Sequence, residues 1–279
     1  MEYLDHERVL SLLPDREQEA HKGNFGRVLL LCGSRGYTGA PALAARGALR
    51  TGAGLIYLGV PEEIYAIEAV KLDEPMVFPL PGEAGTLSER ALPEILSRLE
   101  TTDACLAGPG LGRGPGVEAV VRQVVRCFRG PLVLDADGIN VMAAHKDELC
   151  GRVGPLILTP HPGEFRRLGG DPEDRQGSAE AMARELGAVV LLKGHRTLIT
   201  DGARTYCNTT GNPGMATGGS GDVLSGMILS LLGQGLGPLE AAAAGAWLHG
   251  AAGDLAARRL GQYAMTPTDL LEELPQLLK

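Results

Sequence analysis

Residues 208–222 read NTTGNPGMATGGSGD, and an apolar run of helical period from Val223 to Leu232 follows directly. Gly218, Gly219 and Gly221 have no Cβ, so the backbone amides of this turn can approach a ligand closely. A helix that begins near Gly221 would also aim unsatisfied N–H groups at an anion such as phosphate. A carboxylate at Asp222 would repel that phosphate unless it served a second partner, such as a substrate hydroxyl. The stretch therefore predicts phosphoryl transfer, with an ordinary helix cap at Ser220 or Asp222 as the alternative.

Outward from this stretch, apolar runs of strand length alternate with stretches of helical period. Most of the runs are continuous rather than alternating, which is typical of parallel strands buried on both faces. The pattern predicts an α/β fold, with a mostly parallel central sheet, helices on both of its faces and an antiparallel hairpin over residues 197–207. The expected strands cover residues 27–32, 55–60, 104–107, 132–134, 156–158, 189–193 and 197–200, and the expected helices cover residues 40–51, 87–99, 116–128, 174–186, 223–232 and 239–257.

Composition narrows the class of protein. The 279 residues are 44% hydrophobic, enough for one large core, and we expect a single domain over residues 1–279. Lys and Arg number 26 and Asp and Glu 34, so the net charge of 26 − 34 = −8 opposes binding to nucleic acid or to an anionic membrane. The five cysteines form no CxxC, and neither a secretory signal nor a membrane span is evident, so the sequence predicts a cytoplasmic protein with reduced thiols.

Polar, glycine-rich segments follow five of the expected strands. Because ligands of open α/β sheets bind beyond the carboxyl ends of the strands, we expect these loops to converge on one edge of the sheet. Any one of them could simply turn the chain. The five segments are GSRGYTGAP (33–41), GPGLGRGPG (108–116), DADGIN (135–140), TPHPGE (159–164) and KGHRT (193–197).

Several polar side chains in these loops have candidate roles. Lys193 could steady a phosphate as a compact charge, or simply be solvated. Asp135, Asp137 and Glu164 could hold Mg²⁺ through water, although the two aspartates could equally cap the next helix. His161 lies between two prolines that would fix its backbone, and the other histidines form no metal-ligand set.

Common nucleotide and hydrolase motifs are missing. No GxxxxGK[ST] occurs, which argues against a Walker-type NTPase, and no GxGxxG follows the first strand, which argues against a Rossmann dehydrogenase. GxSxG and HExxH are absent as well.

The ordered motif set nevertheless resembles one family across nearly the whole chain. GNFGRVLLLCGS, TGAPALAARGALRTGAGL, GPGLGR, DADGIN, LTPHPGEFRRL, LLKGH and NTTGNPGMATGGSGDVLSG are together similar to the ADP- or ATP-dependent NAD(P)H-hydrate dehydratases of the ribokinase-like superfamily. Related vitamin kinases usually carry Asn where His161 stands, ahead of the same glutamate, which favours the dehydratases. The resemblance implies a ribokinase-like three-layer fold and repair of hydrated NADH or NADPH: the ring hydroxyl is phosphorylated by a nucleotide, and loss of phosphate restores the double bond.

The resemblance also implies roles for individual residues. Asp222 would be the general base, and Mg²⁺ near Glu164 and Asp137 would offset the nucleotide charge. The matching positions for the hydrate are Ala40, Gly110, His161 and Asp222. Those for ADP or ATP are Lys193, Gly194, His195, Arg196, Thr197, Gly219, Ser220 and Gly221.

The sequence also leads to expectations about the partners of the protein and about alternative functions. Family members commonly form homotetramers, and many are fused to an epimerase domain, which here would be a separate polypeptide because only about two dozen residues precede Gly23. ADP is favoured as the donor by similarity to bacterial chains. A ribokinase-like vitamin kinase of the hydroxyethylthiazole or hydroxymethylpyrimidine type stays as the second hypothesis, and a nucleotide sensor without turnover as the third.

Overall fold

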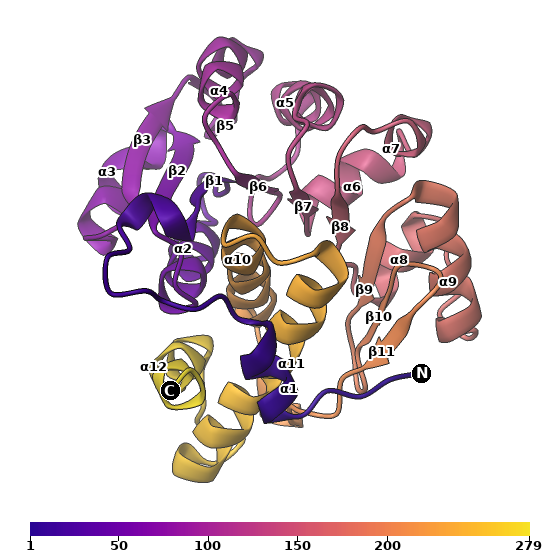
Figure 1. The fold of residues 1–279 in the computed structure, drawn as a ribbon. Coiled ribbons are helices and arrows are strands. Elements are labelled where there is room, and N and C mark those ends of the chain that lie inside the picture. The colour runs from indigo at the N-terminus through magenta and orange to yellow at the C-terminus, as the bar shows by residue number, and fades with distance from the viewer.

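A nine-stranded sheet runs through the centre of the molecule (Figure 1). The computed structural model describes all 279 residues. The strand order is β11-β10-β9-β8-β7-β6-β1-β2-β3, with parallel pairing from β3 to β9 and antiparallel pairing for β10 and β11. The strands are β1 (Arg27–Leu31), β2 (Leu55–Pro61), β3 (Met76–Leu80), β6 (Ala104–Ala107), β7 (Leu132–Leu134), β8 (Leu156–Leu158), β9 (Val189–Leu192), β10 (Leu198–Thr200) and β11 (Thr205–Cys207).

Both faces of this sheet are buried, which accounts for the continuous apolar runs. In β1, Val28 and Leu30 belong to one hydrophobic cluster, whereas Leu29 and Leu31 belong to another on the opposite face. Successive side chains of a strand point to opposite faces, so each strand feeds two separate cores. The prediction of a mostly parallel sheet covered on both faces, with a late antiparallel hairpin, is confirmed.

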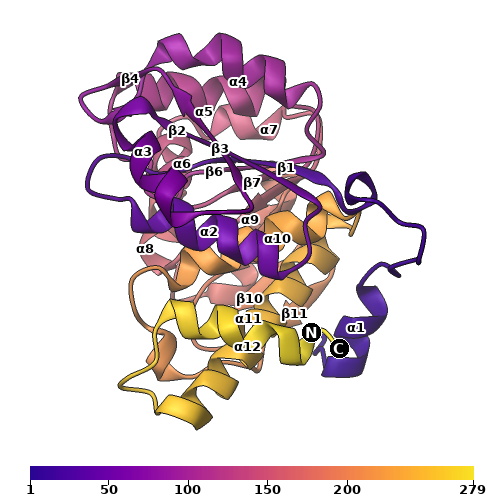
Figure 2. The same ribbon diagram turned by 90° about the vertical axis from the view of Figure 1, so that its left-hand side faces the viewer.

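Helices form the two outer layers (Figure 2). One layer consists of α2 (Gly39–Arg50), α10 (Ser220–Gly233), α11 (Pro238–Leu260) and α12 (Pro267–Leu277), joined by α1 (His6–Leu12) and α3 (Glu62–Lys71). The other consists of α4 (Leu92–Leu99), α5 (Pro115–Cys127), α6 (Asp137–Ala143), α7 (Asp147–Cys150), α8 (Pro162–Arg167) and α9 (Arg175–Leu186). None of these helices combines the length and the apolar character that crossing a membrane requires.

The expected elements do not include β3 or the helices α3, α6, α7, α8 and α12, and one expected helix is shorter than predicted. Strand β3 was not expected because its sequence contains Pro79. A proline is tolerated there because β3 lies at the edge of the sheet, where no further strand pairs with it. Helix α3 exposes Ile67 and Val70 and buries Glu68, so its sequence shows no apolar stripe. The helix expected over residues 87–99 begins only at Leu92, because a small hairpin, β4 (Gly82–Glu83) with β5 (Thr86–Leu87), and a 3₁₀ turn at Glu89–Ala91 come first.

Helices α2 and α10 cross through two glycines. A Cβ on Gly47 would lie 2.6 Å from the carbonyl oxygen of Val223, and a Cβ on Gly226 would collide with the carbonyl oxygen of Ala44. Each helix therefore presses its backbone against the backbone of the other. This contact fixes the position of α10 relative to α2, and the first turn of α10 carries Asp222.

We expect Gly226→Ala to destabilise the protein by about 1–3 kcal/mol, because overpacking forces the two helix backbones apart. Gly39→Ala is the matched control, since a Cβ at this first position of α2 would meet nothing within 4 Å. The free energy of unfolding from urea titration measures both changes. Equal stability of the two variants would contradict the close crossing.

Candidate functional site

The five glycine-rich loops meet where β1, β6, β7, β8 and β9 end, an edge that we call the carboxyl rim. Hydrogen bonds connect loops that are distant in sequence. The Ser34 hydroxyl donates to the carbonyl of Gly110 at 2.7 Å, and the Gly112 N–H donates to the Asp137 carboxylate at 2.9 Å. Across the next strands, Lys193 Nζ donates to Asp135 Oδ1 at 2.8 Å. The predicted convergence of the loops is thereby confirmed.

Helix α10 begins at the carboxyl rim without a side-chain cap. Its N-cap residue is Gly219, which takes a left-handed conformation with a φ of 93°. The N–H groups of Gly221 and Asp222 donate to no atom of the chain. A Cβ at the neighbouring Gly218 would meet nothing within 4 Å. The turn thus presents free amides to open space, and neither Ser220 nor Asp222 acts as the cap.

Asp222 carries an unusual charge environment. Burial raises the pKa of its carboxyl from 3.8 to about 7, repulsion from Asp135 and Asp137 adds to the rise, and Lys193 opposes it. No side-chain hydrogen bond or ion pair satisfies this carboxylate within the chain. A carboxyl with a pKa near neutrality can take up and release a proton at physiological pH, as a general base must.

Lys193 is the cation that balances these carboxylates. Burial alone would lower the pKa of its ammonium, but Asp135, Glu164 and Asp222 outweigh that effect and raise the pKa overall. The ion pair with the buried Asp135 holds the ammonium beneath the first turn of α10, where a Cβ on Gly221 would lie 3.4 Å from Nζ. Lys193 is therefore charged and fixed in position rather than merely solvated.

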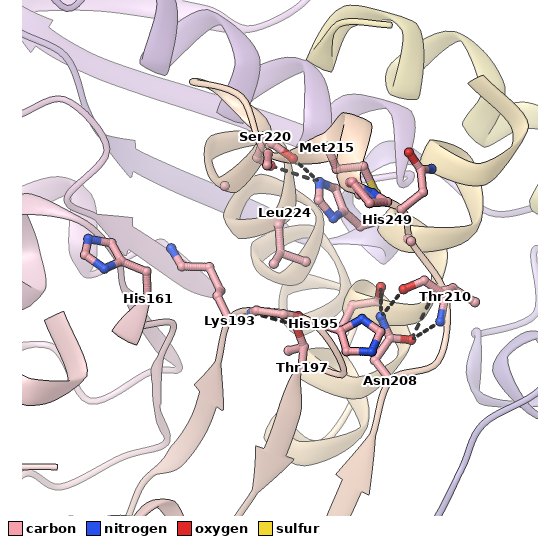
Figure 3. A pocket seen from close by; sticks show the side chains of 18 of the residues that line it. His161, Lys193, His195, Thr197, Asn208, Thr210, Met215, Ser220, Leu224 and His249 are labelled. Atoms are coloured by element: carbon pink, nitrogen blue, oxygen red, sulfur yellow. Dashed lines mark hydrogen bonds between the residues drawn. The ribbon is translucent and has the colours of Figure 1, made fainter. Parts of the chain in front are cut away.

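A pocket of about 920 Å³ opens beside this turn (Figure 3). His161 and Lys193 lie at one end of it, and Asn208, Thr210 and His249 lie toward the other, with Leu224 between them. Of the residues predicted to bind nucleotide, the pocket is lined by Lys193, Gly194, His195, Arg196, Thr197, Ser220 and Gly221, whereas Gly219 stays behind the turn. The cavity thus carries the charge of Lys193 at one end and uncharged polar side chains at the other, an arrangement that suits a nucleotide.

The wall formed by residues 208–216 lies directly on α11. A Cβ at Gly250 or at Gly253 would collide with Thr210 or with Met215. The carboxylate of Asp254 accepts hydrogen bonds from the Gly211 N–H at 2.9 Å and from the Asn212 side chain at 3.0 Å. The small residues of α11 are thus explained by packing within one chain.

Hydrogen bonds from Arg175 hold the KGHRT turn (193–197) in place. Arg175 at the start of α9 donates to the carbonyl of His195 at 2.8 Å and reaches the carbonyl of Arg196 at 3.4 Å. Arg196 itself has a φ of 54°, which is uncommon for a residue with a side chain. The guanidinium therefore stabilises a turn that would otherwise be free to relax.

His161 and Glu164 form a capping box at the start of α8. The ring Nδ1 of His161 accepts from the Gly163 N–H at 2.9 Å, and Glu164 Oε2 accepts from the His161 N–H at 2.9 Å. No group of three or more His, Cys, Asp or Glu side chains is arranged to hold a metal. Asp135 and Asp137 do not cap α6, since their carboxylates bind Lys193 and the Gly112 N–H instead.

Ala40 and Gly110 lie together, away from the large pocket. A Cβ on Gly110 would lie 3.0 Å from the Cβ of Ala40 and 3.1 Å from that of Tyr37. These residues follow β1 and β6, whereas the pocket lies beyond β8 and β9. Asp222 stands between the two regions, influenced by Lys193 on one side and by Asp137 on the other.

His249 is a feature that sequence reasoning missed. It is buried on α11, and its Nε2 lies 2.9 Å from the Ser220 carbonyl and 3.3 Å from the Ser220 hydroxyl. Burial lowers the pKa of this imidazole to about 4, so it is neutral at physiological pH. Its place in an alanine-rich run gave no signal, because only the fold brings α11 against α10.

The family model of NAD(P)H-hydrate dehydratase matches residues 28–276. The chain belongs to this family. The bifunctional NAD(P)H-hydrate repair enzyme of Moorella thermoacetica is 51% identical over 277 residues, covering 96% of this chain but 52% of that enzyme. The chain thus spans about half the length of the curated relatives that it matches first.

Solved structures agree with the family. The ADP/ATP-dependent NAD(P)H-hydrate dehydratase of Bacillus subtilis, co-crystallised with ATP/Mg²⁺, is 32% identical with a TM-score of 0.82, covering 98% of this chain and 96% of that one. A ribokinase-like superfamily protein of Enterococcus faecalis is 29% identical with a TM-score of 0.87, covering 99% and 94%. The dehydratase family of the present chain therefore has the ribokinase-like fold that the motifs predicted.

Replacing Asp222 with Asn should stabilise the fold most at alkaline pH. Because the folded-state pKa is raised from 3.8 to about 7, the folded protein holds a proton across that window which the unfolded chain has released. The contribution of Asp222 to the free energy of unfolding therefore falls as the pH rises toward about 7. Above that pH the folded protein bears the full cost of the buried charge. We expect Asp222→Asn to raise the free energy of unfolding by on the order of 1–3 kcal/mol at about pH 8 and by less at about pH 5. Urea unfolding at both pH values measures the difference, and a larger gain at the lower pH would refute the assignment.

Proposed function

We propose that this protein restores NADH and NADPH from their hydrates by nucleotide-dependent dehydration. The observation that carries the proposal is Asp222, a carboxylate with a pKa near neutrality between a nucleotide-sized pocket and the Ala40–Gly110 contact. Family membership supports it, as does the activity named for the Bacillus subtilis structure. We infer further that residues 1–279 act as one catalytic unit, since one sheet carries every loop of the site.

In the proposed reaction Asp222 acts on the hydroxyl of the hydrated nicotinamide ring. Its carboxylate removes the hydroxyl proton while the oxygen attacks the terminal phosphorus of the donor. The bond from that phosphorus to the rest of the nucleotide breaks, which releases AMP from ADP or ADP from ATP. Phosphate then leaves with the electrons of its C–O bond, and loss of a proton from the adjacent ring carbon restores the double bond.

The chain's own groups stabilise the charge that moves during this transfer. Gly221, with its free amide, and the fixed ammonium of Lys193 line the pocket end where the phosphates would lie, and the free amide of Asp222 follows in the same turn. The pocket in front of this end, which we call the donor pocket, would hold ADP or ATP. His161, Ala40, Gly110 and Asp222 would contact the hydrate, with the imidazole of His161 oriented by its capping bonds to α8.

Magnesium is proposed as the companion of the donor. Burial is the main cause of the raised pKa of Asp222, and repulsion from Asp135 and Asp137 adds to it, so these three carboxylates gather negative charge that a nearby cation would offset. Mg²⁺ usually takes one or two carboxylates and keeps several waters, so the lack of a three-ligand group fits it. Asp137 and Glu164 would approach it through water, and the ion would neutralise phosphate charge.

Other expectations remain predictions. A homotetramer, an epimerase partner and a preference for ADP are inferred from resemblance, and a cytoplasmic location is inferred from the sequence. The vitamin kinase hypothesis differs in its product, since a kinase would release a stable phosphorylated alcohol. A nucleotide sensor would bind donor without any product.

The decisive assay follows recovery of absorbance at the reduced-nicotinamide band from hydrated NADH, with Mg²⁺ and either ADP or ATP. We expect nucleotide-dependent recovery, and a loss of about 10²–10⁴-fold in Asp222→Ala if this carboxylate is the base. Asp147→Ala, which removes an exposed carboxylate on α7, should keep full activity. Absence of recovery with either nucleotide would reject the dehydratase, and phosphorylation of small alcohols should then be assayed.

The pH dependence of kcat/KM should show an acidic limb near pH 7 that moves upward in Lys193→Met. Lys193 lowers the pKa of Asp222, so its removal leaves burial and carboxylate repulsion unopposed. Lys146→Met, which breaks an ion pair with Glu185 far from the site, should leave the limb in place. A limb that stays fixed or moves downward in Lys193→Met would show that Asp222 is not the titrating base.

A further inference from the structure

Two arginines and a tyrosine lie beside the Ala40–Gly110 contact with no role in the site described so far. Arg35 and Tyr37 belong to the loop after β1, and Arg113 belongs to the loop after β6. All three are exposed, and the Tyr37 side chain reaches 61% exposure. They lie beyond the strands at the centre of the sheet, on the side of Asp222 opposite the donor pocket.

The β4–β5 hairpin lies against the loops that carry both arginines. The Arg35 N–H donates to the Gly85 carbonyl at 2.7 Å, and the aliphatic stem of Arg35 covers Gly85 so closely that a Cβ there would collide with it. On the other side, Cβ atoms at Gly112 and Gly114 would lie 3.2 Å and 3.9 Å from the side chain of Thr86. Arg35 and the glycines on either side of Arg113 thus lie beside the neighbouring hairpin residues Gly85 and Thr86.

Neither guanidinium has an acidic partner. No ion pair and no side-chain hydrogen bond involves Arg35 or Arg113, although the chain has a net charge of −8. Glu63 reaches the same hairpin but accepts from the Gly85 N–H at 3.3 Å, and Glu83 forms no ion pair. The loops themselves are held by the Ser34–Gly110 and Gly112–Asp137 bonds, so the two cations project from a fixed base.

We propose that Arg35 and Arg113, with the exposed ring of Tyr37, form a subsite for the diphosphate and distal nucleoside of a dinucleotide substrate. The proposal rests on the proposed function. With the hydrated ring at Ala40, Gly110 and Asp222 and the phosphoryl donor on the other side, the rest of the dinucleotide must extend along this part of the carboxyl rim. Its diphosphate is matched by paired guanidinium groups, and its base can stack on an aromatic ring.

The test compares dinucleotide with mononucleotide. Binding of NADH and of reduced nicotinamide mononucleotide is measured by calorimetry with the donor pocket saturated by ADP and Mg²⁺. We expect the intact protein to bind NADH more tightly than the mononucleotide. In the double variant Arg35→Ala with Arg113→Ala, the affinity for NADH should fall by about 10-fold or more, while the affinity for the mononucleotide is unchanged. Equal affinity of the intact protein for both ligands, or an advantage that survives in the double variant, would overturn the subsite.

A matched control and a second readout separate this proposal from the proposed function. Arg129→Ala removes an exposed, unpaired arginine near the amino end of the central strand β7, away from the carboxyl rim, and it should change neither affinity. Thermal unfolding of the double variant should match that of the intact protein. In turnover, the double variant should raise KM for hydrated NADH and spare the mononucleotide hydrate. If the intact protein showed no turnover of hydrated NADH, the proposed function would be rejected. The binding comparison would still decide whether the subsite exists.

Discussion

The fold places a carboxylate where electrostatics disfavours it, and one ammonium makes that placement tolerable. Asp222 sits in the first turn of α10, within the influence of Asp135 and Asp137, and the pair of Lys193 with Asp135 supplies the opposing charge. The pair also joins the end of β9 to the end of β7. Each loop of the site is therefore positioned with respect to the same small cluster of charges, and a shift in any of them would change the proton affinity of Asp222.

Close backbone packing holds that cluster in place. Gly47 and Gly226 bring α2 and α10 together, and Gly250 and Gly253 let residues 208–216 lie on α11. Side chains of ordinary size at these positions would move the first turn of α10 or the pocket wall by ångströms. The precision of the site is therefore set by the packing of the helices around it, as is common where binding groups must be preorganised.

Much of this could be predicted from the sequence, for reasons that differ between elements. Continuous runs such as RVLLL identified buried parallel strands, and parallel strands bring their following loops to one edge, so Lys193 and Asp135 could be expected to lie near each other. Neither the burial of Glu68 nor the contact of His249 with Ser220 could be predicted, because both depend on how helices pack after the sheet has formed. Arg175 was missed for the same reason, since its partners are carbonyl groups whose directions follow from a single strained turn.

The separation of the donor pocket from the Ala40–Gly110 contact has a consequence for the order of events. Under the proposed function, a donor and a hydrate that bind on opposite sides of Asp222 would not block each other, so either could bind first and either product could leave first. That arrangement would correspond to a sequential mechanism through a ternary complex, without a phosphorylated enzyme. A saturating concentration of one ligand would then not inhibit binding of the other. The steady-state rate would depend on the ligand whose concentration is lower relative to its KM.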